Sequence, residues 1–472
     1  MNRERARTAV ICGVQFIDVM GVTVVVAALP RMLADLQGSP TQAGLLVPAY
    51  AVGFGGLLLL GARLGDARGP RRVLLAGLAV FALGSVLCAV APAVSWLVAG
   101  RLLQGVAAAI SIPNALVLLI GATEPGRSRN RALAAWNATG GLAGASGLLV
   151  GGLVTDSLGW RVIFWATLAA TAVLALAIVR LVGPADARTA TSLNAGSVVL
   201  QVVSVSALVA AANAFGSSWL AAGLLAVLAI ALVPALVVRE RSTASPLIPP
   251  GIWRRHGTAG GVIGSFGITA TTSTFVVITT LWFQDARGLG PGAAGLMILP
   301  FSFAVVLGAA LAARLVKRGA RLVLVVGLIL IGLGALGVVL EPEIPVTVVA
   351  LVLSGFGNGI GAVAAYTLGT DVPAEEQASA AGLLNTAAQL GTAVMVALGV
   401  GIATAVGPGV DHTSGWLTVA ATAAAVTAAT LATRRRTAAA PPAADSAAPP
   451  TTAPATPPDA DSEAAVPGCR RR

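Results

Sequence analysis

Two ionisable residues, Asp18 and Arg101, lie deep within long apolar stretches of the sequence. A charge in a hydrocarbon environment is costly, so such a residue usually has a partner or lines a path for a solute or a proton. A buried carboxyl group can also take up and release a proton as its surroundings change. We therefore consider two interpretations of this pair, a static structural ion pair and a proton-coupling pair.

Uncharged amide side chains form a second polar set within the apolar stretches. An amide without a partner is costly there, so it either bonds to a neighbouring helix or faces a cavity. Packing between helices is the favoured interpretation for any single member, and we predict that the set as a whole contributes to a substrate cavity. The set comprises Gln15, Gln104, Asn114, Asn137, Asn358, Asn385 and Gln389.

The elements that carry these residues are predicted to be membrane-spanning helices. The chain has 472 residues, of which 56% are hydrophobic and 10% charged, and its mean hydropathy is +0.88. A spanning helix needs about 20 mostly apolar residues. Between residues 8 and 433, breaks at charge clusters and Gly/Pro turns predict fourteen spans, which makes the chain an all-α, multi-pass membrane protein.

The basic residues predict the orientation of these spans. With the N-terminus inside, nearly all of the 30 Lys and Arg fall in inner segments, and only Arg31, Arg161 and Arg287 fall in outer ones. Cytoplasmic loops hold this excess in membrane proteins. Both termini are therefore expected to be cytoplasmic, and the apolar run after the first basic residues is expected to be retained as the first span.

The two halves of the sequence are related. The stretch SPTQAGLLVP (39–48) is echoed by GPGAAGLMILP (290–300), and several matches share one offset along the chain. The predicted organisation is a six-helix bundle over 1–182, a linker over 183–257 with two additional spans and a basic connector, a second bundle over 258–433 and a disordered tail over 434–472. Repeated halves of this kind form transporters that open a central site alternately to either side.

Four motifs carry a family resemblance over about residues 8–433. They are GARLGDARGPRR (61–72) between the second and third spans, GRLLQG (100–105), GLLVGG (147–152) and AALP (27–30). Together with fourteen spans they resemble the major facilitator superfamily, and within it the drug:proton antiporters with two additional central helices. The resemblance implies a bacterial plasma-membrane exporter of hydrophobic or cationic small molecules, such as antibiotics, that exchanges them for protons by alternating access.

The resemblance also implies roles for particular residues. It implies proton coupling through Arg101, for which the buried carboxyl group of Asp18 is the candidate proton carrier. It also makes Asp66, with Arg71 and Arg72, a conformational latch between the halves at the cytoplasmic face. Glycines of this loop permit a tight turn, and its arginines can alternatively serve only to fix orientation in the membrane. The second half has Val316-Lys317-Arg318 around the equivalent place and lacks the acid, so the latch is expected to be one-sided.

The sequence departs from the family pattern at two places. The usual acid of the first span would fall on Gly21, whereas Asp18 lies three residues earlier, which is roughly 4.5 Å along a helix. Leu148 replaces the usual proline of the fifth span, although the helix-packing glycines Gly147, Gly151 and Gly152 remain. Both departures weaken the inference of proton antiport more than the inference of transport itself.

Other classes of function receive little support from the sequence. The only histidines, His256 and His412, fall in loops on opposite faces without a metal-ligand cluster or nucleophile motif, and no G-x-x-x-x-G-K-[ST] loop occurs. We expect no enzyme, no cofactor or metal, no nucleic-acid partner and a monomer whose partners are a small molecule, protons and the lipid bilayer. A metabolite or siderophore exporter, or a proton-independent facilitator of the same fold, is the alternative.

Overall fold

A computed structural model describes residues 2–124, 127–183, 195–215, 218–242, 256–405 and 410–438. Long apolar runs fold here into helices, because in lipid each backbone polar group needs a partner within its own segment. The helices of the first half are α1 (Asn2–Asp35), α2 (Pro40–Arg68), α3 (Pro70–Ala89), α4 (Val94–Gly121), α5 (Arg127–Leu158) and α6 (Arg161–Leu181).

The remaining helices follow the same alternating course. They are α7 (Ala195–Ala214), α8 (Trp219–Ser242), α9 (His256–Leu281), α10 (Pro291–Leu315), α11 (Ala320–Leu340), α12 (Ile344–Gly369), α13 (Ala374–Ala405) and α14 (His412–Ala438). A short π-helix, η2 (Trp282–Ala286), extends α9, and a short 3-10 helix, η3 (Val316–Arg318), follows α10.

The described helices support a multi-pass membrane protein. Twelve of them are long and apolar enough to span a bilayer, and α2 makes a thirteenth if its two segments, bent by 49°, form one span. The apolar part of α7, Gly196–Ala212, is shorter than a usual span. All fourteen predicted spans thus correspond to helices, and the count of fourteen crossings remains a prediction.

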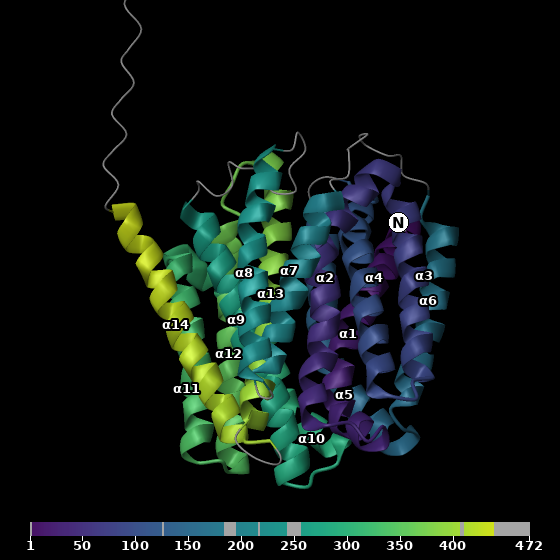
Figure 1. The fold of residues 1–472 in the computed structure, drawn as a ribbon. Coiled ribbons are helices and arrows are strands. Elements are labelled where there is room, and N and C mark those ends of the chain that lie inside the picture. The colour runs from purple at the N-terminus through teal and green to yellow at the C-terminus, as the bar shows by residue number, and fades with distance from the viewer. Residues whose placement is uncertain are drawn as a thin grey trace, which may run out of the picture.

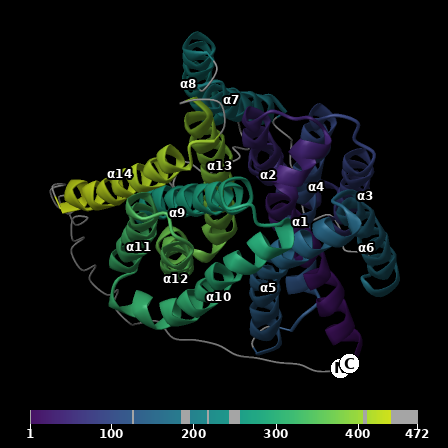
Figure 2. The ribbon, with the colours of Figure 1, turned by 90° about the horizontal axis from the view of Figure 1, so that it is seen from below.

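The helices group into two bundles that lie side by side (Figure 1). Helices α1 to α6 contact one another, as do α9 to α14. The two groups meet mainly where α2 packs on α13 and α5 packs on α10, with smaller contacts from α1 to α9 and α10. Figure 2 shows these two seams on either side of a centre formed by α1 and α9. A site in this centre is therefore enclosed by helices of both halves.

Helices α7 and α8 form an additional pair at one side of the molecule (Figure 2). Helix α7 packs against both α2 and α13, where Val205 and Val209 meet Ala393 and Ala397. Helix α8 keeps large apolar side chains such as Leu220 and Ile230 exposed, as expected of a surface that faces lipid. The pair therefore covers the α2–α13 seam and leaves the α5–α10 seam free.

The two bundles use similar turns at corresponding places. Gly69 joins α2 to α3 with φ of 88°, and Gly319 joins η3 to α11 with φ of 137°. These are left-handed conformations that residues with a Cβ atom rarely adopt. The glycines of GARLGDARGPRR thus include one that the backbone of the turn requires.

Part of the predicted linker and tail lies outside the described residues. This holds for most of the basic connector, residues 243–255, and for residues 439–472 of the predicted tail. The predictions for both segments stand as made.

Candidate transport cavity

A cavity of about 290 Å³ lies between the two bundles, at the middle of the helices that line it. Its wall combines apolar side chains, two glycines, several hydroxyls and one amide. Helices α1, α2 and α5 of the first bundle and α9, α10, α12 and α13 of the second supply it. The lining residues are Val22, Thr23, Val26, Val47, Gly140, Gly144, Leu148, Thr269, Thr272, Ser273, Val276, Val277, Phe301, Ser302, Val305, Asn358 and Thr392.

A buried polar cluster surrounds Arg101 inside the first bundle. The Arg101 side chain is 1% exposed and donates hydrogen bonds from Nη1 to the Gly21 carbonyl oxygen at 2.9 Å and to Gln104 Oε1 at 2.8 Å. Its guanidinium lies over the Tyr50 ring, 4.6 Å from the centroid, which is a cation–π geometry. Gln104 donates onward to Ser85 Oγ at 2.9 Å, so the cluster connects α1, α2, α3 and α4.

Asp18 belongs to this cluster and does not line the cavity. It is 5% exposed and interacts with Tyr50 and Arg101, without an ion pair to Arg101 within 4 Å. Two guanidinium nitrogens of Arg101, Nε and Nη2, have no hydrogen-bond partner among the described residues. Asp18 lies one helical turn before Val22, which does line the cavity. The acid is thus buried beside the cavity, near a guanidinium group that has two nitrogens without a hydrogen bond to a described residue.

Three glycines allow α5 to approach its neighbours closely. A Cβ atom added to Gly147 would lie 2.0 Å from Thr23 Oγ1, and one added to Gly151 would lie 2.7 Å from Val24 of α1. A Cβ atom on Gly152 would lie 2.4 Å from the Pro291 carbonyl oxygen of α10. Gly147 and Gly151 therefore fit α5 to α1, whereas Gly152 fits it to the opposite bundle.

Polar contacts join the two bundles at the face away from the N-terminus, where α5 ends and α10 begins (Figure 1). The Asp156 carboxylate of α5 accepts a hydrogen bond from the Gly292 N–H at 2.6 Å. This N–H is in the first turn of α10, where the helix dipole favours a negative charge. Gln284 of η2 also donates to the Ala27 carbonyl oxygen of α1 at 3.0 Å. The bundles are therefore held together at this face.

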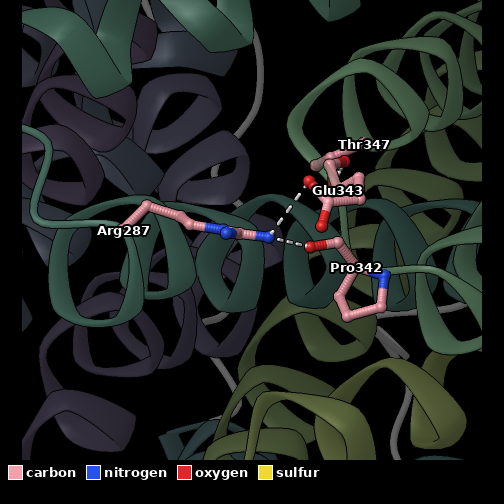
Figure 3. Close-up of polar contacts among 4 residues, drawn as sticks. All are labelled: Arg287, Pro342, Glu343 and Thr347. Atoms are coloured by element: carbon pink, nitrogen blue, oxygen red, sulfur yellow. Dashed lines mark hydrogen bonds and ion pairs between the residues drawn. The ribbon is translucent and has the colours of Figure 1, made fainter.

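A separate cluster joins two loops of the second bundle at the same face (Figure 3). Arg287 forms an ion pair with Glu343 at 3.6 Å and donates a hydrogen bond to the Pro342 carbonyl oxygen. The Thr347 hydroxyl donates to the Glu343 carbonyl oxygen at 2.9 Å, and the Arg287 guanidinium lies over the Trp282 ring, 4.7 Å from its centroid. These contacts lie within one bundle and do not involve the cavity.

We expect Glu343→Gln to have a small effect. The Arg287 and Glu343 side chains are 33% and 60% exposed, and exposed ion pairs contribute about 0–1 kcal/mol. Arg287 would keep its contacts with Pro342 and Trp282. Thermal unfolding of the purified protein should shift by at most a few degrees, and transport should stay within about twofold of wild type. A variant that folds but does not transport would show that this pair takes part in the conformational cycle.

The predicted latch residues are not paired across the bundles in this conformation. Asp66, near the end of α2, is partly buried and makes no hydrogen bond or ion pair with any described residue. Arg71 donates from Nη2 to the Val179 carbonyl oxygen of α6 at 2.8 Å, within the first bundle, and Arg72 is exposed. The hydrogen bonds between the bundles, from Gly292 to Asp156 and from Gln284 to Ala27, thus lie at the opposite face from Asp66.

The predicted amides fall in different surroundings. Asn358 lines the cavity, and Gln15 lies beside Gly140 of its wall. Gln104 belongs to the Arg101 cluster, whereas Asn114 donates to the carbonyl oxygens of Gly61 and Ile110 and so joins α4 to α2. Gln389 packs against Gly55 at the α2–α13 seam, Asn385 is partly buried in α13, and the side chain of Asn137 in α5 is outside the described part of the chain.

Most polar groups of the cavity were not predicted from the sequence. They are hydroxyls, and four of the residues that bear them, Thr269, Thr272, Ser273 and Ser302, lie on α9 and α10. The stretch ITATTSTF (268–275) concentrates hydroxyl residues in the middle of an apolar span, and that density was the available signal. Single hydroxyls are common in membrane helices because they donate to a carbonyl of the preceding turn, so the signal is weak for each residue alone.

Two helical bundles around a central cavity, with apolar helices that span the membrane, define the architecture of a membrane transporter. The sequence model of the Major Facilitator Superfamily matches residues 11–391 and 261–462. The chain therefore belongs to the major facilitator superfamily, which is a family of transporters.

Curated relatives include proteins of antibiotic resistance and export. The chain is 36% identical over 412 residues to the puromycin resistance protein pur8 of Streptomyces alboniger, covering 82% of this chain and 80% of that protein. It is 32% identical to the cephamycin export protein CmcT of Amycolatopsis lactamdurans, covering 83% and 84%. The multidrug resistance protein Stp of Mycobacterium tuberculosis is 28% identical, with 84% of this chain and 75% of Stp covered.

Solved structures share the fold at low sequence identity. A POT family transporter superposes with a TM-score of 0.69 at 13% identity, covering 91% of this chain and 96% of that one. The human organic anion transporter MFSD10 superposes with a TM-score of 0.62 at 16% identity, covering 90% and 99%. These similarities confirm the predicted fold class.

Proposed function

We propose that the protein exports a drug-like or antibiotic small molecule from a bacterial cell in exchange for protons, by alternating access. The main observation behind this proposal is a cavity of about 290 Å³ between the two bundles. The buried acid Asp18 lies one helical turn from its wall. The relatives named for puromycin resistance and cephamycin export support the class of substrate. The distribution of Lys and Arg supports a plasma-membrane protein with both termini in the cytoplasm, and we expect it to act as a monomer.

The buried cluster supports proton coupling. Asp18 is the only acid, and Arg101 the only basic residue, among the buried polar side chains of the described chain. Because Arg101 bonds to the Gly21 carbonyl oxygen, movement of α1 against α4 would change the distance between acid and cation. We propose that a proton binds Asp18 in one conformation and leaves in the other, while Val22 and Thr23 carry the movement of α1 to the cavity.

Alternating access is supported by where the bundles meet. The contacts of Asp156 with Gly292 and of Gly152 with Pro291 join them at the face away from the termini, which we assign to the outside. In the opposite state these contacts would break, and Asp66 would find its partner on the other bundle at the cytoplasmic face. We propose that Asp66, with Arg71 and Arg72, is the latch of that second state.

The test is transport in proteoliposomes that contain the purified full-length protein. Puromycin movement is measured with and without a pH gradient, together with the internal pH reported by a trapped dye. Antiport predicts that a proton gradient accelerates puromycin movement about tenfold or more and that puromycin drives proton flux in return. Puromycin movement that is unchanged when the gradient is collapsed would identify a facilitator instead.

A further inference from the structure

The hydrogen-bonding groups of the cavity come mainly from the second bundle. That bundle supplies the hydroxyls of Thr269, Thr272, Ser273, Ser302 and Thr392 and the amide of Asn358. Among the described lining residues of the first bundle, Thr23 is the only one with a polar side chain. Opposite them, the first bundle presents mostly valine, leucine and glycine. The side formed by the second bundle therefore carries most of the hydrogen-bonding groups, set among Val276, Val277, Phe301 and Val305, and the side formed by the first bundle is almost entirely apolar. We call these the polar side and the apolar side.

The bonds already made on the polar side determine what it still offers. Thr269 donates to the Ala388 carbonyl oxygen at 2.6 Å, and Thr272 donates to the Ile268 carbonyl oxygen at 2.7 Å. A hydroxyl that has used its one hydrogen retains only acceptor lone pairs. These two oxygens can thus accept a hydrogen bond from a ligand and cannot donate one.

Two other groups on this side have no partner within the described protein. Neither the Ser302 hydroxyl of α10 nor the Asn358 amide of α12 makes a hydrogen bond to a described residue. Ser273 and Thr392 bond to each other at 3.0 Å and link α9 to α13. Ser302 and Asn358 can therefore both donate hydrogen bonds to a ligand and accept hydrogen bonds from it.

No residue in the described wall is acidic or basic. Asp18 and Arg101 belong to the buried polar cluster inside the first bundle and are not among the lining residues. A permanent cation entering the cavity would give up part of its hydration without meeting an opposite charge, which is unfavourable. An uncharged molecule loses much less on leaving water, and its apolar face is stabilised by contact with the valine-lined side.

We propose that the cavity accepts uncharged amphipathic molecules that carry hydrogen-bond donors along one edge, in preference to permanent cations. The polar edge of the molecule contacts α9, α10 and α12, and its apolar face contacts α1, α2 and α5. This inference rests on the proposed function in taking the cavity as the substrate site, and it narrows the substrate class expected from the sequence, which included cations.

The test compares two naphthalene probes with the purified full-length protein. N-phenyl-1-naphthylamine is uncharged and has one N–H donor, and N,N,N-trimethyl-1-naphthylammonium is a permanent cation. Binding is followed by quenching of tryptophan fluorescence, corrected with empty detergent micelles. We expect the uncharged probe to bind at least about tenfold more tightly. Equal or tighter binding of the cation to the wild-type protein would overturn the proposal, as would no saturable binding of either probe.

A gain of function provides the second arm. Asn358→Asp adds a carboxylate to the wall and should raise affinity for the trimethylammonium probe about tenfold. Gln201→Glu makes the same change from amide to carboxylate on α7, outside the described cavity wall, and should leave that affinity unchanged. If Asn358→Asp does not fold, Ser302→Asp tests the same point from α10. Equal effects of the wall variant and the control would overturn the assignment of the polar side.

The two proposals can fail separately. Probe binding in detergent requires no pH gradient, so a facilitator would still show the preference for the uncharged probe. Conversely, gradient-driven puromycin export with a preference for the cationic probe would retain antiport and reject the uncharged substrate class.

Discussion

Replacing Asp18 by Asn is expected to abolish transport driven by a pH gradient, with a loss of roughly a hundredfold or more, a range typical of removing an essential proton-transfer group. Asn has the size of Asp but cannot ionise at physiological pH. Asp18 is the one acid among the buried side chains of the described chain, so no described buried group is available to replace it. The measurement is gradient-driven export of puromycin from proteoliposomes.

A second readout separates coupling from folding and binding. Exchange of labelled for unlabelled puromycin without a gradient should survive in Asp18→Asn, because the altered residue lies outside the cavity wall. Asp35→Asn is the matched control on α1. Asp35 is at the end of the helix, where it accepts a hydrogen bond from Trp160 Nε1 at 3.0 Å, and an Asn oxygen can still accept that bond. Full gradient-driven export by Asp18→Asn would remove the acid from the mechanism.

Apolar runs and charge gaps were sufficient to predict the helices. A run such as residues 321–340 has the length of a span and is bounded by breaks, and α11 (Ala320–Leu340) follows it closely. The buried positions of Asp18 and Arg101 could likewise be inferred, since each has apolar neighbours on both sides. The interaction of both residues with Tyr50 could not be inferred from the sequence. Tyr50 is on α2, and only the packing of α1, α2 and α4 brings the three residues together.

The cavity was less accessible to sequence reasoning. The sequence predicts that amides in apolar runs contribute to the cavity, yet Asn114 bonds to two backbone carbonyl oxygens and Gln104 bonds to Ser85. A polar side chain in a span has several possible partners, and hydropathy does not say which neighbouring helix it faces. The sequence does not distinguish Asp156 from an exposed loop residue, because it lies near the end of a span and only the structure places α10 beside it.

Gly152→Ala is expected to shift the protein towards the state that is open at the face away from the termini. A Cβ atom at this position would lie 2.4 Å from the Pro291 carbonyl oxygen and 2.9 Å from the Gly292 Cα atom. Both are backbone atoms of α10, so no side-chain rotation relieves the contact and the helices must separate. Overpacking of this kind costs about 1–3 kcal/mol, here only in the conformation in which α5 and α10 touch.

The shift can be measured by labelling a cysteine in the cavity wall. Val47→Cys is introduced after replacement of Cys12, Cys88 and Cys469 by Ser, and a membrane-impermeant maleimide is added from the side opposite the termini. Labelling should rise about tenfold with Gly152→Ala, because 1.4 kcal/mol changes an equilibrium tenfold. Export should fall to a similar extent, since the cycle must pass through the conformation that the added methyl group disfavours.

Gly144→Ala is the matched control on the same helix. Its added Cβ atom would have no neighbour closer than Val19 at 4.0 Å, so α5 can accept it without moving. Labelling of Val47→Cys should therefore stay at the wild-type level in this variant. If Gly152→Ala folds and its labelling also stays at that level, then the α5–α10 contact does not close this face, and the cavity must be sealed there by the contact of Gln284 with Ala27 or by other residues.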